Sequence, residues 1–400
     1  MKKNILISVF DMEIGGIERS LINMLESFDY HKFNVDLFIC EHKGDLMCQI
    51  PKKVNILSQI NKYSVFRKPI KQCLKEGHYA TSLIRIGSKF IAEAKARSKD
   101  FKEGSGYIQM QLVQKYASIF LPRFKKRYDV AISYAWPHDI VAKNVNAEKK
   151  IAWIHTDYSK LEIDNRLDLR GWMQFNHIIS ISDECTKSFL TKYPTLEEKV
   201  LTLENITSPN FINNLAQDHI PLTEINSKGN FNILSVGRLS YVKGFDMAVK
   251  ALRLLHDKGL TYIKWYVIGY GGYESELSEL ISSYNLQDSF ILLGKKINPY
   301  PYMKACDLYV QPSRYEGKAV TVTEAKILKK PIIITAYPTA KSQLINGVEG
   351  IICNLSVEGL STTIEKLAED KKERERLIEN LKKFDYSNTE ELNKLYQLIG

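Results

Sequence analysis

Short apolar segments alternate with helix-like segments along almost the whole chain, and this alternation restricts the fold more than any other feature. Each apolar segment is bounded by turn residues, as is typical of strands in the interior of a sheet. Strands that alternate with helices form parallel βα units, so the chain is predicted to be α/β. The predicted strands are residues 4–10, 34–40, 129–134, 151–155, 177–182, 200–204, 231–239, 263–268, 290–293, 307–311, 331–335 and 350–353.

The alternation passes through two cycles, which predicts two Rossmann-like domains. The second cycle begins at residues 231–239, after a polar stretch that contains proline. A chain of 400 residues is long enough for two or three domains. The expected divisions are an N-terminal domain over 1–207, a linker over 208–229, a C-terminal domain over 230–384 and a terminal helical segment over 385–400.

Positive charge is concentrated in one segment of the chain. The formal net charge is +10, and residues 61–127 hold sixteen Lys or Arg against four Asp or Glu, which leaves −2 for the remainder. These basic residues alternate with apolar ones at roughly helical spacing, which favours binding to anionic lipid or another polyanion. A solvated face of a basic protein is the alternative. No nucleic-acid-binding motif is present, so nucleic acid is not an expected partner.

The sequence predicts neither a membrane-spanning helix nor a disulfide framework. No apolar run is long enough to cross a bilayer. The start, MKKNILISVF, is similar to a signal peptide, but Asp11 and Glu13 follow without a cleavage site, so we expect a first strand instead. Six scattered cysteines favour a reducing, cytoplasmic environment and no structural zinc. They are Cys40, Cys48, Cys73, Cys185, Cys306 and Cys353.

Two glycine-containing loops are candidate phosphate-binding sites. Gly15 and Gly16 follow the first strand and precede a helix, where the backbone and free amides favour an anion. A simple strand-to-helix turn is the alternative for this pair. Gly237, Arg238 and Lys243 follow the first strand of the second cycle. The arginine and the lysine are spaced to place two cations over one phosphate group.

The stretch PSRYEGKAVTVTEAK, residues 312–326, contains Glu316 and Glu324, eight residues apart. It is predicted to be a strand end, a tight turn at Gly317 and a helix. Ligands of open parallel sheets bind at the carboxyl ends of strands, and a helix start offers amides to an anion. Two carboxylates on either side of an anion site suit a nucleotide-sugar. A solvated helix glutamate and an ordinary loop acid are the alternative.

In this order, the Gly-Arg-Leu and Lys-Gly loop and the two glutamates resemble the signature of retaining glycosyltransferases of family 4. The resemblance implies the GT-B fold, with two Rossmann-like domains facing each other across a cleft. It implies that the N-terminal domain binds the acceptor and the C-terminal domain the nucleotide-sugar. It also implies that the terminal helix crosses back onto the N-terminal domain.

The resemblance implies roles for individual residues. Arg238 and Lys243 are expected to neutralise the leaving diphosphate, with Gly237 beside them. Glu324 is expected to accept hydrogen bonds from the ribose, and Glu316 from the donor sugar. The donor-binding set then also includes Gly15, Gly16 and Gly317, together with Lys318 and Ala319. At these last two positions many family members have an aromatic residue and a glycine, so we expect the sugar pocket to differ.

His155 lies at the end of a predicted first-domain strand, in the segment WIHTDYSK. By resemblance it contacts the transferred sugar, and Asp157 orients it or the acceptor. A structural histidine is the alternative.

The combined expectation is a retaining, metal-independent glycosyltransferase that acts on a carbohydrate acceptor. The acceptor is expected to be lipid-linked, in cell-surface polysaccharide or glycolipid synthesis, with the enzyme peripheral on the inner face of the cell membrane. No Asp-x-Asp motif is present, so protein cations replace a metal ion and no cofactor is expected. The rival predictions are a GT-B sugar-nucleotide epimerase or hydrolase and a non-catalytic partner subunit.

Overall fold

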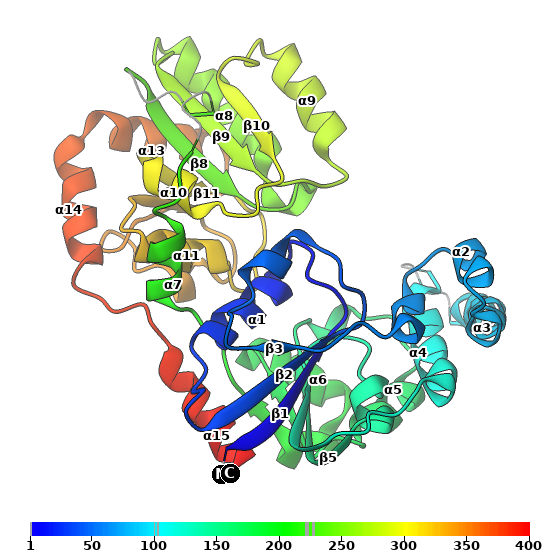
Figure 1. Ribbon diagram of the computed structural model, residues 1–400. Helices are drawn as coiled ribbons and strands as arrows, with labels where there is room; N and C mark the ends of the chain where they lie inside the picture. The colour runs from blue at the N-terminus through cyan, green and yellow to red at the C-terminus, as the bar shows by residue number, and fades with distance from the viewer. Residues whose placement is uncertain (1, 100, 102–103, 221–223, 226–228) are drawn as a thin grey trace. The chain divides into compact units, whose positions relative to one another are not determined.

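The computed structural model describes residues 2–99, 101, 104–220, 224–225 and 229–400. The chain forms two compact units, Met1–Thr207 with Asn388–Gly400, and Ser208–Ser387 (Figure 1). Each unit is built around one parallel sheet with flanking helices, so the α/β prediction is confirmed. The two units are described separately below.

The first unit contains a seven-stranded sheet of order β3-β2-β1-β4-β5-β6-β7. Its strands are β1 (Lys3–Val9), β2 (Phe33–Ile39), β3 (Asn55–Ile56), β4 (Arg127–Ser133), β5 (Asn146–Ile154), β6 (His177–Ser180) and β7 (Val200–Thr202). Its α-helices are α1 (Gly16–Glu26), α2 (Ile70–Lys75), α3 (Tyr79–Ser98), α4 (Gly106–Ala117), α5 (Asn165–Trp172), α6 (Asp183–Lys192) and α15 (Leu392–Ile399).

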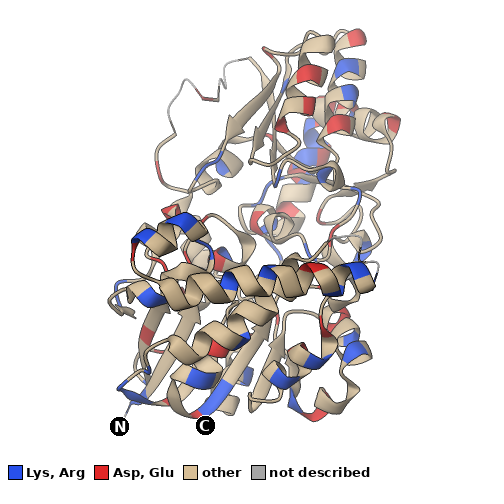
Figure 2. Ribbon diagram, turned by 90° about the vertical axis from the view of Figure 1, so that its right-hand side faces the viewer, with Lys and Arg blue, Asp and Glu red and all other residues tan. Residues whose placement is uncertain are grey.

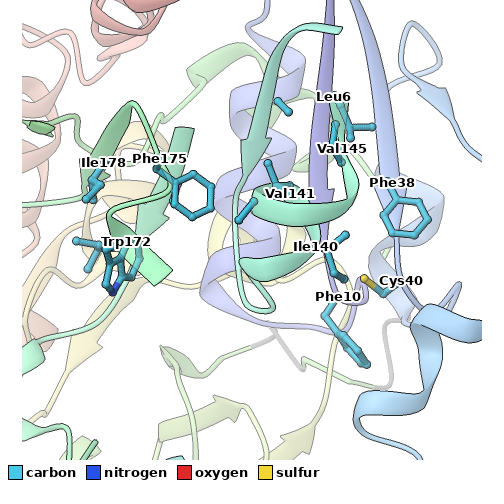
Figure 3. Packing of buried hydrophobic residues seen from close by; sticks show 14 of the residues in the cluster. Leu6, Phe10, Phe38, Cys40, Ile140, Val141, Val145, Trp172, Phe175 and Ile178 are labelled. Atoms are coloured by element: carbon cyan, nitrogen blue, oxygen red, sulfur yellow. The ribbon is translucent and has the colours of Figure 1, made fainter. Parts of the chain in front are cut away.

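Apolar residues on both faces of the central strands build the core of the first unit. The last five residues of β1, Ile5–Val9, are all buried, as expected of a parallel strand covered on both sides. Figure 3 shows one core cluster, in which Leu6 of β1 and Phe38 of β2 lie near Ile140 and Val141. The same cluster continues to Trp172, the last residue of α5, and to Phe175 just after it, so the core extends from the sheet to the helices beside it.

The second unit contains a six-stranded sheet of order β10-β9-β8-β11-β12-β13. Its strands are β8 (Phe231–Val236), β9 (Ile263–Ile268), β10 (Phe290–Gly294), β11 (Leu308–Gln311), β12 (Ile332–Thr335) and β13 (Ile351–Cys353). Its α-helices are α7 (Pro209–Leu215), α8 (Phe245–Asp257), α9 (Glu274–Ser283), α10 (Tyr300–Ala305), α11 (Val320–Ile327), α12 (Ala340–Gln343), α13 (Val357–Glu369) and α14 (Lys371–Leu381).

All twelve predicted strands are present, with shifted ends. The largest shift is at β5, which begins at Asn146 rather than at residue 151 because its first half is polar and carries no apolar pattern. The additional strand β3 was not predicted. It has only two residues, and both of them are exposed.

The basic segment 61–127 is mostly helical, as predicted. It contains the 3-10 helix η2 (Asn61–Phe66), α2, α3 and α4. α3 ends at Ser98 and α4 begins at Gly106, and residues 102–103 between them lie outside the described residues.

The end of the chain belongs to the first unit. The side chain of Asn388 accepts from the Thr207 amide at 2.7 Å and donates to the Asn205 carbonyl at 3.0 Å. In α15, the ring of Tyr396 packs against Phe28 and Phe33, with centroids 5.5 Å and 5.1 Å away. These contacts attach the last helix to the start of β2 and to the residues just before it.

Residues 208–229 differ from the expected linker. They begin with α7, which packs against α10 and α11 of the second unit. Ile212 and Ala216 are buried there with Tyr300 and Ile327, so this part of the segment contributes to a core. Residues 221–223 and 226–228 lie outside the described residues.

Within the described part of the chain, every helix is too short or too polar to span a bilayer. All six cysteines are free thiols.

Candidate active site

Two neighbouring strands of the second sheet end in the loops that carry the predicted donor-binding residues. β8 is followed by Gly237 and Arg238, and β11 is followed by residues 312–319. The two strands pair in parallel, so both loops leave the same edge of the sheet. The chain extends the sheet toward β10 on one side of this pair and toward β13 on the other. Such a switch point is where open α/β sheets bind their ligands.

A glycine and an arginine hold these two loops together. Gly244 has a φ of +69°, and a Cβ atom at this position would lie 2.0 Å from the carbonyl oxygen of Pro312, so only glycine fits. The guanidinium of Arg314 donates to both carboxylate oxygens of Asp246 at 2.7 Å. It also donates to the carbonyl of Tyr241 at 2.7 Å and lies over the ring of that residue. Arg314 therefore connects the loop after β11 to the loop and helix after β8.

Glu316 and Lys243 form an ion pair between these loops. The Nζ atom of Lys243 lies 2.6 Å from Oε1 of Glu316. The same oxygen accepts from Gln311 Nε2 at 3.0 Å and from Ser313 Oγ at 2.5 Å. In the described part of the chain no donor bonds the other oxygen, Oε2, although the residue is only 8% exposed. The carboxylate is thus fixed in position with one oxygen left to accept from a ligand.

Arg238 contrasts with Lys243. Its side chain is exposed and has no hydrogen-bond or ion-pair partner among the described residues. A guanidinium at a strand end without an internal partner is available to bind an anion in a fork geometry.

Glu324 lies inside the second unit, on α11. It is 2% exposed, and its Oε1 atom accepts from the hydroxyl of Tyr300 at 2.8 Å. A fully solvated helix glutamate, the alternative from sequence, is therefore wrong. Burial also raises the pKa of Tyr309 far above its usual range, with smaller contributions from the nearby charges of Glu324 and Glu316.

The loop between the two glutamates differs from the expected tight turn at Gly317. This glycine has no positive φ, and a Cβ atom would meet no neighbour within 4 Å. Gly317 and Lys318 are exposed, whereas Ala319 is buried. The amide of Ala319, at the start of α11, donates to Gln343 Oε1 at 2.8 Å, so this amide of the predicted anion site is bonded within the protein. Glycine is therefore not required here by the backbone.

In the first unit, His155 follows the end of β5. Its Nε2 atom lies 2.8 Å from the carbonyl oxygen of Tyr134, which requires a proton on Nε2. Burial lowers the pKa of His155 to about 4, partly offset by that hydrogen bond, so the ring is neutral at pH 7 and Nδ1 is an acceptor.

Asp157 does not orient His155 in this arrangement. Its carboxylate accepts from the amide of Ser159 at 2.9 Å and from the hydroxyl at 2.7 Å, which caps the short turn at Tyr158–Lys160. The Tyr134 carbonyl takes the positioning role that the sequence had suggested for Asp157.

The Gly15–Gly16 loop packs against its own helix. A Cβ atom on Gly15 would lie 2.2 Å from Oε2 of Glu18, whereas Gly16 is exposed and has open space. The pKa of Glu18 is raised to about 7, mainly by burial and to a smaller extent by the nearby Asp11, while a backbone hydrogen bond and the charge of Arg67 oppose the rise. No side chain caps the start of α1. Because the Glu18 carboxyl group is the far end of a flexible side chain, it can move away, and this contact does not require glycine at position 15.

A cavity of about 390 Å³ lies within the first unit, beside the ends of β4 and β5. Its volume falls within the roughly 300–1,000 Å³ range of small-molecule sites. Aromatic rings, amides and imidazoles share its wall, which suits an uncharged polar ring such as a sugar. Among its lining residues are Gln111, Gln114, Trp136, His138, His155, Tyr158, Trp172 and Gln174.

His138 is the lining residue that the sequence analysis missed. Its Nδ1 atom lies 2.8 Å from Ser133 Oγ, and its ring centroid lies 4.9 Å from that of Trp172. Burial, together with the nearby His155, lowers the pKa of His138 to about 3, so both imidazoles in the cavity are neutral at pH 7. His138 lies a few residues after the end of β4, as His155 lies after the end of β5. This similar position was the signal in the sequence that could have identified His138 as a candidate site residue.

Two aspartates of the cavity wall are held by hydrogen-bond donors. Asp139 accepts from Lys143 at 2.5 Å and from Gln114 at 3.1 Å. Asp168 accepts from Trp172, Tyr193 and Gln111 at 2.8, 2.9 and 3.0 Å. Burial raises the pKa of Asp168, and these donors oppose that rise. The wall therefore presents polar groups that are fixed in orientation.

The predicted site residues thus fall into two groups. Gly237, Arg238, Lys243, Glu316, Gly317 and Lys318 surround the switch point of the second sheet, with Ala319 and Glu324 on or beside α11. Gly15, Gly16, His155 and Asp157 belong to the first unit. Within the described ranges no cluster of three or more His, Cys, Asp or Glu side chains is placed to hold a metal ion.

Residues 222–384 match the family of glycosyl transferases, group 1. An uncharacterized glycosyltransferase of Methanocaldococcus jannaschii is 26% identical over 51% of this chain and 52% of its own length. The N-acetylgalactosamine-N,N'-diacetylbacillosaminyl-diphospho-undecaprenol 4-alpha-N-acetylgalactosaminyltransferase of Campylobacter jejuni is 31% identical over 36% of this chain and 40% of its own length. The capsular polysaccharide biosynthesis glycosyltransferase CapM of Staphylococcus aureus is 28% identical over 52% of this chain and 56% of its own length. The chain spans about half the length of these relatives.

Solved structures with the GT-B fold match the chain over almost its full length. HepE of Anabaena, in complex with UDP and glucose, has a TM-score of 0.66 and 16% identity, and the match covers 99% of each chain. TarM has a TM-score of 0.65 and 14% identity, covering 100% of this chain and 99% of its own. The fold is therefore GT-B, as the sequence predicted. The match to the family of group 1 glycosyl transferases is over residues 222–384.

Proposed function

We propose that this protein transfers a sugar from a nucleoside-diphosphate donor to a saccharide acceptor during synthesis of a cell-surface polysaccharide. The observation that carries the proposal is the grouping of Arg238, Lys243 and Glu316 at the β8–β11 switch point of a group 1 glycosyltransferase domain. The relatives from Campylobacter jejuni and Staphylococcus aureus, by their names, act on a diphospho-undecaprenol saccharide and in capsule synthesis.

In the donor complex, the diphosphate lies against Arg238 and Lys243. Arg238 is unpaired among the described residues, so its fork is free for phosphate oxygens. Lys243 is already 2.6 Å from Glu316, and on donor binding it shares its charge between that carboxylate and the phosphate. Preorganised cations in a water-poor site stabilise the developing charge by roughly 3 kcal/mol each.

The two glutamates accept hydrogen bonds from the hydroxyl groups of the donor. Oε2 of Glu316 accepts from the transferred sugar, because Oε1 is held by Lys243, Gln311 and Ser313. Glu324, whose carboxylate is oriented by Tyr300, accepts from the ribose. Gly317 and Lys318 are exposed beside them and contact the donor through the backbone.

Transfer proceeds with retention of configuration and without a metal ion. The bond between the anomeric carbon and the phosphate oxygen breaks, and the acceptor oxygen forms its bond on the same face. The departing phosphate oxygen takes the proton of the acceptor hydroxyl. In this reaction the protein supplies positioning and charge, and no enzyme nucleophile is required.

The first-unit cavity receives the acceptor saccharide. Nδ1 of neutral His155 and Oε1 of Gln114 can accept from sugar hydroxyls, and Nε2 of His138 is the ring nitrogen left for a further hydrogen bond, while Trp172 offers an aromatic face. The saccharide is lipid-linked, and the protein is peripheral on an anionic membrane.

Calorimetric titration with UDP and GDP tests the donor site. We expect one of the two to bind, and Arg238→Ala to weaken that binding at least tenfold, since one charge-assisted bond is worth about 1.5–3 kcal/mol. The exposed Lys250 on α8, changed to Ala, is the matched control and should leave affinity unchanged. Equal affinity of the Arg238→Ala variant and the wild type would remove this residue from the site.

A further inference from the structure

The long helix α3 has most of its large apolar side chains on the outside, while Ile84 packs partly buried against the core. Tyr79 is 65% exposed, and Leu83 and Phe90 are each 67% exposed. The residues that α3 buries are small or hydroxyl-bearing, namely Thr81, Ser82, Ser88, Ala92 and Ala96. A surface helix of a water-soluble protein has the opposite arrangement, with its apolar side facing the core. Folding of this chain alone does not account for the outer face of α3.

The exposed apolar residues form one continuous stripe. Tyr79, Leu83, Ile86 and Phe90 are separated by four, three and four residues, which places them on one side of a helix. At a rise of about 1.5 Å per residue the stripe is roughly 16 Å long. Figure 2 shows α3 crossing the front of the first unit as its outermost helix on this side, with Lys and Arg distributed along it.

The inner face of α3 holds the helix in place without help from the stripe. Ala92 packs with Ile108 and Leu112 of α4, where the small side chain allows the two helices to approach closely. Arg85 donates to the carbonyl of Val65 at 2.7 Å and to that of Lys68, which attaches α3 to the segment before α2. The stripe is therefore presented on a supported helix.

The charge beside the stripe identifies the kind of partner. Residues 70–99, which contain α2 and α3, hold seven Lys or Arg and two Asp or Glu. Lys71 and Lys75 of α2 are exposed and have no ion-pair partner among the described residues, and Lys89 reaches Glu93 only at 3.9 Å. A second copy of this chain would bring the same positive charge to the stripe. Anionic lipid headgroups around a hydrocarbon layer are complementary to it.

We propose that the outer face of α3 docks onto an anionic lipid bilayer. Tyr79, Leu83, Ile86 and Phe90 enter the boundary between headgroups and acyl chains, and Lys71, Lys75 and Lys89 contact lipid phosphates. The role of this docking rests on the proposed function, because it would bring the enzyme to a lipid-linked acceptor. Binding itself requires neither donor nor catalysis.

Vesicle co-sedimentation of the full chain tests the apolar stripe. We compare phosphatidylcholine vesicles with vesicles of phosphatidylcholine and phosphatidylglycerol, and expect binding only to the anionic ones. Leu83→Asn with Phe90→Asn should lower the partition coefficient at least tenfold. Tyr262→Asn with Leu355→Asn changes side chains that are 37% and 41% exposed on the second unit, and should bind as the wild type does.

A charge variant tests the cations. Lys71→Glu, Lys75→Glu and Lys89→Glu together should abolish binding. Lys68 and Arg85 are left unchanged, because Lys68 is paired with Glu76 and Arg85 holds backbone carbonyls. Circular dichroism and UDP titration of each variant separate docking from folding and from the donor site. Failure to bind either UDP or GDP together with intact vesicle binding would contradict the proposed function and leave the docking surface standing.

Two results would overturn the docking proposal. One is equal recovery with neutral and anionic vesicles, or no recovery with either. The other is a dimer in size-exclusion chromatography that Leu83→Asn with Phe90→Asn dissociates, which would make the stripe an interface between copies of this chain.

Discussion

Lys243 is the residue on which the donor site depends most, since its ammonium belongs both to the ion pair with Glu316 and to the proposed phosphate site. We expect Lys243→Ala to lower kcat by roughly 10²–10³, the range found when one preorganised group that stabilises transition-state charge is removed. Steady-state kinetics checks this. Lys243→Arg keeps the charge and should retain more activity than the alanine variant. Full activity of Lys243→Ala would exclude the residue from the reaction.

Glu18 makes the stability of the protein dependent on pH. Its pKa is about 7 in the folded chain against an ordinary value of 4.5, mainly because it is buried. Between these values the folded state holds a proton that the unfolded state has released. Ionisation of Glu18 therefore costs no stability below about pH 4.5. The free energy of unfolding then falls as the pH rises through 7.

We accordingly expect Glu18→Gln to stabilise the protein at pH 8 and to have little effect at pH 5. The ceiling is about 3 kcal/mol, at roughly 1.36 kcal/mol per pKa unit. Denaturant unfolding at the two pH values measures it. An equal change in unfolding free energy at both would contradict the raised pKa.

The sequence identified the residues of the two motifs, but it did not predict which side chains they contact in the folded protein. The pairing of Lys243 with Glu316 joins residues from two distant loops, and no spacing along the chain specifies it. Gly317 was expected to allow a tight turn, yet its backbone is one that any residue adopts, whereas Gly244 has the positive φ. His138 was missed because a single histidine in a loop is a weak signal. Its position after β4, parallel to that of His155 after β5, gains its meaning from the cavity that both residues line.

At the scale of elements, the loops after β8 and β11 act as one structure because Arg314 connects them. Strand positions followed from local apolar runs, so the sequence predicted them well. The support between loops depends on side chains that meet only after the sheet has formed, so the sequence contained no signal for the Arg314–Asp246 pair. The exposed stripe on α3 was recognised only as an apolar and basic pattern, because the direction of its faces is set by packing on α4.

We expect Arg314→Lys to destabilise the second unit by about 1–3 kcal/mol, because a lysine loses the two-point bond to Asp246. It should also weaken UDP binding, since the loops that carry Arg238 and Glu316 lose their support. Thermal unfolding and calorimetry measure the two effects. A double-mutant cycle with Asp246→Asn provides the control, and additive changes would show that the pair does not couple the loops.

At the scale of the whole molecule, the fold could be predicted because alternating strands and helices allow few arrangements. The charge pattern was harder to interpret. Several cations of the basic segment are used internally, including Arg67 with Asp11, Lys95 with Asp164 and Lys126 with Asp36. The net charge of residues 61–127 therefore overstates the charge available to a partner, and the α2–α3 surface is one part of the segment that keeps exposed lysines without an ion pair among the described residues.

The most direct test of the account is release of nucleoside diphosphate from a panel of UDP- and GDP-sugars, with and without a lipid-linked saccharide extract. The assay is repeated in excess EDTA and with the Lys243→Ala variant. We predict release from one donor that depends on the extract, survives EDTA and is lost in the variant. Release that requires Mg²⁺ or Mn²⁺, proceeds equally without the extract, or is unchanged in Lys243→Ala would contradict metal-independent sugar transfer at the β8–β11 site.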